Sequence, residues 1–217
     1  DTPTINVTQT NEAGVVLTTQ DAETDGVPTP HDTDVSAINF GGVFGLTSSA
    51  GADGGSATPL SYDLNVTAQN SGLMSHGLVI NLFEVNGVIF GTTAGVAPVD
   101  ATTPGVVFSL AVSGSGVVTL TQYQQVDHAV EGVTTSPFDD QFATLVNGKI
   151  TLTASSTITD GDGDQATDQE VVDLGGNIRF ADDGPDAVND NAVQGVENSP
   201  VIIDVFANDA PGADGVN

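Results

Sequence analysis

The sequence contains no cysteine and no tryptophan, and only two of its 217 residues, Lys149 and Arg179, carry a fixed positive charge. The absence of cysteine excludes disulfides, thiol chemistry and cysteine-ligated zinc. The scarcity of Lys and Arg disfavours nucleic acid and anionic membrane surfaces as partners, because both need side chains that neutralise phosphates. No apolar run approaches the length of about 18 residues that suggests a membrane-spanning helix. We therefore expect no membrane insertion.

Carboxylate charge is what the chain has in excess. There are 29 acidic residues and a net charge of −27, although charged residues make up only 14% of the chain. Two carboxylates about 4 Å apart repel each other by about 1 kcal/mol in water and by about 4 kcal/mol near a protein surface. Two interpretations follow: a solvated acidic surface that keeps the protein soluble, or a folded chain that takes up external cations.

The hydrophobic pattern is that of β-strands. Apolar and polar residues alternate in Ile5–Thr8 and Leu60–Thr67, and no stretch keeps the spacing of an amphipathic helix. Turn signals punctuate the rest. They predict strands around Asn86-Gly87 within Leu78–Phe90, a pair Val106–Val112 and Val117–Tyr123 around Ser113–Gly116, a pair Phe142–Val146 and Lys149–Ile158 around Asn147-Gly148, and strands Val171–Leu174 and Asn177–Phe180 around Gly175-Gly176.

These strands predict an all-β fold. Several short strands with turns between them are typical of an antiparallel β-sandwich of the immunoglobulin or cadherin kind. Two segments rich in small and turn-forming residues, Ala22–Asp34 and Ser48–Pro59, predict long surface loops that enlarge it.

A short internal repeat predicts the domain boundary. Asp183-Gly184-Pro185 repeats the form of Asp1-Thr2-Pro3. We expect residues 1–183 to form one sandwich unit, and residues 184–217 to form a linker and the first strands of a following cadherin-like unit.

The sharpest local motif is Asp160-Gly161-Asp162-Gly163-Asp164. Alternating Asp and Gly can turn three carboxylates toward one point, which suits a hard cation such as Ca²⁺ that takes six to eight oxygen ligands. The motif begins like an EF-hand loop but lacks its Gly and Glu, since Gln165 and Val171 occupy those positions. Calcium ligation by Asp160, Asp162 and Asp164 and a merely solvated turn remain the two interpretations.

The sequence contains two further acidic clusters. The first falls at the expected junction between units, where a calcium ion would fix the angle between them; a flexible, solvated acidic linker is the alternative. It comprises Asp182, Asp183, Asp186 and Asp190. The second comprises Asp21, Glu23 and Asp25, and we interpret it as part of a solvated loop.

Nothing in the sequence predicts catalysis. The three histidines, His31, His76 and His128, show no metal-ligand spacing, and no Gly-x-Ser-x-Gly nucleophile motif is present. With 29 carboxylates, no acid–base pair can be singled out. We expect a structural, hydrogen-bonding role for His128 and no enzymatic activity.

The order of motifs resembles a repeat domain of giant type I-secreted RTX adhesins of bacteria. Such repeats place a strand before Gln-Tyr and Asp-His, then a strand, Asp-x-Asp-Gly-Asp, a strand and Asp-Asp-Gly-Pro. The matching segments are Val117–His128, Ile150–Asp164 and Ile178–Pro185. In the tail, Val196–Val201 is similar to the opening of a cadherin-like module, and Asp186–Asn191 to a cadherin calcium linker with one residue too many.

The resemblance implies a secreted, monomeric protein of the bacterial cell surface, with calcium-dependent rigidity and a role in adhesion or biofilm. Two functions remain open. In the first, the chain is a structural extender whose partners are neighbouring repeat units of the same chain. In the second, it is an adhesin module that recognises a glycan or peptide of a host or substrate surface.

Overall fold

The computed structural model describes residues 2–24, 33–128, 141–183, 188–193, 195–198, 200–204 and 206–209. These residues contain fifteen strands and two short 3-10 helices. In order, they are β1 (Thr4–Gln9), β2 (Leu17–Gln20), η1 (Asp21–Thr24), β3 (Asp34–Asn39), η2 (Gly41–Val43), β4 (Phe44–Ser49), β5 (Gly55–Ala57), β6 (Ser61–Val66), β7 (Asn70–Ser75), β8 (Leu78–Val85), β9 (Val88–Thr92), β10 (Val106–Val112), β11 (Val117–Gln122), β12 (Phe142–Thr144), β13 (Ile150–Asp160), β14 (Gln165–Asp173) and β15 (Ile178–Ala181). The expected all-β, sandwich-like fold is confirmed.

The largest sheet has six strands in the order β3-β11-β10-β9-β8-β7. Two of the expected hairpins lie within it. β8 and β9 pair antiparallel around Asn86 and Gly87, whose φ angles of 52° and 79° are those of a turn that matches strand twist. β10 and β11 pair around Ser113–Gly116, where the Ser113 N–H donates to Val117 O across 2.9 Å.

The second large sheet is built around β13. β14 pairs with one edge of β13, while β6 and β5 pair in succession with its other edge. β5 lies inside Ser48–Pro59, so the expected loop contains a short strand. Along β13, every second residue is buried, from Ile150 to Asp160. This strict alternation is the mark of a strand with one face on the core.

The turns at Asn147-Gly148 and Gly175-Gly176 were located correctly, but the strand pairing expected around Asn147-Gly148 was wrong. β12 does not pair with β13 across Asn147-Gly148; it pairs with β15, which in turn pairs in parallel with β2. The turns at Asn147 and Gly175 lie against each other, since a β-carbon at Gly175 would come within 2.2 Å of Asn147 Cα. The strands on either side of each turn consequently continue into different sheets rather than pairing with each other.

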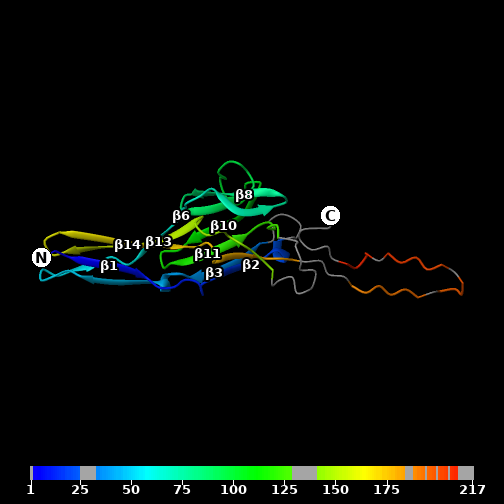
Figure 1. Ribbon diagram of the computed structural model, residues 1–217, viewed down its shortest axis with the longest axis horizontal. Helices are drawn as coiled ribbons and strands as arrows, with labels where there is room; N and C mark the ends of the chain where they lie inside the picture. Colours follow the sequence, from blue (N-terminus) through cyan, green and yellow to red (C-terminus); the bar gives the residue numbers. More distant parts are fainter. Residues whose placement is uncertain are drawn as a thin grey trace.

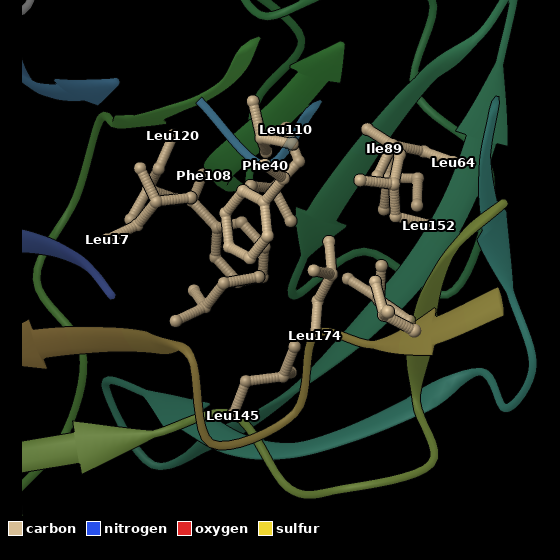
Figure 2. Packing of buried hydrophobic residues seen from close by; sticks show 14 of the residues in the cluster. Leu17, Phe40, Leu64, Ile89, Phe108, Leu110, Leu120, Leu145, Leu152 and Leu174 are labelled. Carbon is tan, nitrogen blue, oxygen red and sulfur yellow. The ribbon is translucent and has the colours of Figure 1, made fainter. Parts of the chain in front are cut away.

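The sheets enclose one hydrophobic core (Figure 2), to which most strands contribute. Phe108 of β10 and Phe180 of β15 join two sheets there, with ring centroids 5.1 Å apart. Phe108 also lies against Gly91 of the neighbouring strand, where a β-carbon would come within 2.4 Å of its ring. Gly91 therefore makes room for the aromatic ring at the centre of the sandwich.

The molecule is elongated (Figure 1). The β13–β14 turn lies beside β1 at one end of the long axis, and η1 lies toward the other end of the folded body. No strand is found among the described residues beyond 187, and Val188 N–H donates to Asp209 Oδ1 there. The boundary at 183/184 stays a prediction. Across the described ranges, no helix is long and apolar enough to cross a membrane.

The contact of Gly91 with Phe108 yields a stability prediction. Gly91→Ala should lower the free energy of unfolding by about 1–3 kcal/mol, because Phe108 is fully buried and cannot yield to an added methyl group. Gly95→Ala is the matched control, since a β-carbon at Gly95 meets nothing within 4 Å. Urea unfolding at constant calcium measures both variants, and equal midpoints for the two would contradict the packing argument.

Candidate metal centres

The Asp-Gly-Asp-Gly-Asp motif forms the turn between β13 and β14, as expected. Asp160 N–H donates to Asp164 O across 3.0 Å and closes the turn. Asp160 occupies the last position of the buried row of β13, so its side chain points inward and the residue is only 6% exposed. Asp162 and Asp164 are exposed. One oxygen from each of the three carboxylates lies within 4.8 Å of the others.

The two oxygens of Asp160 differ in their surroundings. Oδ1 accepts backbone N–H groups from Gly163 and Asp164, at 3.1 and 2.8 Å. Oδ2 is buried and accepts no hydrogen bond from any N–H or hydroxyl group of the described residues. A buried carboxylate oxygen without a partner is costly. Oδ2 is therefore the atom of this turn that most needs an external partner.

The carboxyl groups of Asp160 and Asp162 perturb each other. A hydrogen bond with the Asp162 carboxyl, reinforced by the backbone N–H groups, lowers the pKa of Asp160. The same hydrogen bond, followed by the charges of Asp160 and Asp164, raises the pKa of Asp162. Asp162 can donate this hydrogen bond only while it carries a proton. In the absence of a cation, a proton on Asp162 reduces the repulsion between the carboxylates. A cation bound between them would take over that role.

Glycine is required in this turn for two separate reasons. Gly163 has a φ of 99°, in the region that L side chains rarely adopt. Gly161 lies against the preceding loop, where a β-carbon would come within 2.2 Å of Asp53 O. The contact with Asp53 is a tertiary one that the motif does not reveal. It braces the turn from the side of β5.

Asp182 lies elsewhere, with two residues that the sequence motifs did not single out as ligands. It follows β15 and comes together with Asp21, at the start of η1, and His128, which follows β11. Asp21 is fully buried, so its interpretation as part of a solvated loop is wrong. Glu23 and Asp25, its partners in that interpretation, lie outside the described side chains.

The alternation of buried and exposed residues along the strands could have indicated that Asp21 and Asp182 point inward. Leu17 and Thr19 are the buried positions of β2, and Asp21 continues that row by one step. Ile178 and Phe180 form the buried row of β15, and Asp182 continues it in the same way. Nothing in the sequence around His128 indicates its partners, because they come from strands far away in the chain.

Of the four acidic residues of the expected junction, the three that the structure describes do not gather at one point. Asp183 and Asp190 belong to no metal-competent group within the described part of the chain. Asp186 lies outside the described residues. Calcium binding by the junction as a whole stays a prediction.

A shallow hollow of about 550 Å³ lies beside the end of β11. Its lining is rich in hydroxyl and amide groups, including those of Thr102, Thr103, Gln124 and Gln125. The Tyr123 hydroxyl, which also faces this region, bonds to Ser109 Oγ at 2.9 Å. Ala101, Pro104 and Val106 also line the hollow, so polar and apolar groups share its surface.

Comparison with known proteins places the chain in a family but assigns no activity. No curated protein and no solved structure matches the chain. A family profile described as a domain of unknown function, DUF5801, matches residues 7–175. That match covers β2 to β14 completely, with both large sheets and the β13–β14 turn. The chain therefore belongs to the DUF5801 family.

Proposed function

We propose that this chain is an extracellular, calcium-binding structural repeat of a large bacterial surface adhesin, which calcium rigidifies. The observation that carries the proposal is the turn at Asp160, Asp162 and Asp164, with its buried and unpartnered Asp160 Oδ2. An all-oxygen ligand set of carboxylates favours Ca²⁺ over softer metals. The chain is a secreted spacer and not an enzyme.

The shape and charge of the molecule support an extender. The body is elongated, and the candidate calcium turn lies at one end of its long axis (Figure 1). A net charge of −27 with only two Lys or Arg residues leaves the carboxylates without internal counterions. Calcium, which is abundant outside cells, would relieve the repulsion and stiffen that end of the unit. Neighbouring repeat units of the same chain are the proposed partners.

A ligand-binding module is the second candidate function. The hollow beside Tyr123, Gln124 and Gln125 favours it, because its hydroxyl and amide lining suits a glycan or polar peptide. In this alternative, the fold serves as a scaffold for recognition at the cell surface.

Calcium should raise the stability of the wild-type chain. At about 10 mM calcium, roughly a hundredfold above the tighter dissociation constants of extracellular modules, one native-state site adds about 2.7 kcal/mol. For a chain of this length, that corresponds to a rise in Tm of about 5–10 °C. Differential scanning calorimetry in chelator and in calcium measures it, with magnesium as the control cation. An unchanged Tm would sink the calcium proposal.

Asp162→Asn should have effects of opposite sign with and without calcium. The pKa of Asp162 is raised in the folded chain, so its favourable contribution holds below the unfolded pKa and is lost as pH rises through the folded pKa. At neutral pH in chelator, the variant should therefore be at least as stable as the wild type. In calcium it should be less stable, because one ligand is gone.

Asp63→Asn is the matched control for this experiment. Asp63 is exposed on β6 and loses the same charge without touching the turn. Its difference from the wild type should be the same in chelator and in calcium. If Asp162→Asn behaves like this control, the turn is a solvated one.

The two candidate functions differ in ligand binding. An extender should show no saturable binding when the 217-residue chain is tested, in calcium, on an array of glycans and matrix peptides. Saturable binding to one class of glycan or peptide would favour the recognition module instead.

A further inference from the structure

Asp21, His128 and Asp182 come together from three distant parts of the chain. They lie at the ends of structural elements: Asp21 directly after β2, His128 in the segment after β11, and Asp182 directly after β15. β2 and β15 are neighbouring parallel strands, so their buried rows end side by side. The fold consequently places two carboxylates next to each other at the end opposite the β13–β14 turn.

The imidazole of His128 is oriented so that Nδ1 faces both carboxylates. Its Nε2 lies 2.9 Å from Phe180 O, and because a carbonyl can only accept, Nε2 carries the proton and donates it there. A histidine that ligates a metal typically donates its other ring N–H in this way. Nδ1 has no hydrogen-bond partner among the described residues, although the side chain is only 4% exposed.

The distances within the cluster suit a shared ion better than direct hydrogen bonds. His128 Nδ1 lies 3.5 Å from Asp21 Oδ2 and 3.5 Å from Asp182 Oδ1. A charge-assisted hydrogen bond would be about 2.7–2.9 Å long. Ligand atoms bound at about 2.0–2.2 Å to one tetrahedral ion lie about 3.4 Å apart. Both measured separations match that tetrahedral edge.

Asp21 is held in place by hydrogen bonds to both of its carboxylate oxygens. The Gln122 amide donates to Oδ1, and Val126 N–H donates to Oδ2 across 3.1 Å. These contacts orient the carboxylate, as hydrogen bonds to ligand side chains do at metal centres. The side chain of Asp182 is 13% exposed, so the cluster opens toward solvent on that side, where water can complete a coordination shell.

We propose that Asp21, His128 and Asp182 form a metal site of their own, which takes a borderline divalent transition metal such as Zn²⁺. One imidazole nitrogen and two carboxylates favour such ions, whereas the all-oxygen turn at Asp160 favours calcium. A divalent cation cancels the charge of the two carboxylates in a buried setting, where uncompensated charge is costly. The site does not depend on the proposed calcium site. It would add a second metal-binding position at the other end of the unit.

A metal ion at this site would cross-link three segments at the end of the last strand. The ion would tie Asp182, directly after β15, to η1 and to the segment after β11. The segment after β11 is also anchored by Asp127 N–H, which donates to Met74 O, and by the buried side chain of Val126. The ion would add to these contacts. Metal uptake would thus stiffen the point at which the chain leaves the sandwich.

Metal titration of the full 217-residue chain in saturating calcium tests the proposal. The wild type should take up one equivalent of Zn²⁺, and Co²⁺ in its place should give the intense visible absorption of a tetrahedral site. His128→Gln should weaken Zn²⁺ binding at least about tenfold. His76→Gln is the matched control, because His76 is an exposed turn residue, and it should bind Zn²⁺ as the wild type does. Asp162→Asn should also leave this site unchanged.

Three outcomes would overturn the proposal. One is an unchanged zinc stoichiometry and affinity in His128→Gln. Another is a wild type that takes up no zinc at near-equimolar concentration. If His128→Gln does not fold by circular dichroism, Asp182→Asn at the more open position replaces it. X-ray absorption of the zinc-loaded wild type then decides directly, and a spectrum without an imidazole ligand is the third outcome.

Discussion

The alternation of side chains along β-strands is the constraint on which the rest of this structure depends. Because successive residues point to opposite faces, the strand face that packs into the core also decides where the residue after the strand points. Asp160 is the last member of the buried row of β13, and Asp21 and Asp182 continue the buried rows of β2 and β15 by one step. Hydrophobic packing thus carries three carboxylates inward at the ends of the sheets, where their charges must be compensated.

Compensation cannot come from the protein's own cations. With two Lys or Arg residues against 29 carboxylates, the chain lacks the groups that would form internal ion pairs. The two carboxylate clusters differ in their donor atoms. At the β13–β14 turn, all three ligand atoms are oxygens, whereas at the other end an imidazole joins two carboxylates. The two clusters therefore offer different donor sets: three oxygens at one end, and two oxygens with one nitrogen at the other.

Much of the local structure could be predicted from residues close together in the chain. The hairpins at Asn86-Gly87 and Ser113–Gly116 formed as expected, because a two-residue or short Gly-rich turn leaves little choice of partner. The turn of Asp160, Asp162 and Asp164 was equally local. The pairing around Asn147-Gly148 was wrong, because the contact of Gly175 with Asn147 leads the adjoining strands into different sheets.

By itself, the sequence determined the all-β class, the uncompensated acidic charge and the three-carboxylate turn, since each follows from composition or from neighbouring residues. Only the tertiary structure decided that Asp182 meets Asp21 and His128. The physical reason is the parallel pairing of β15 with β2. Parallel neighbours bring together residues about 160 positions apart in the chain, and no local pattern encodes which strand lies beside which.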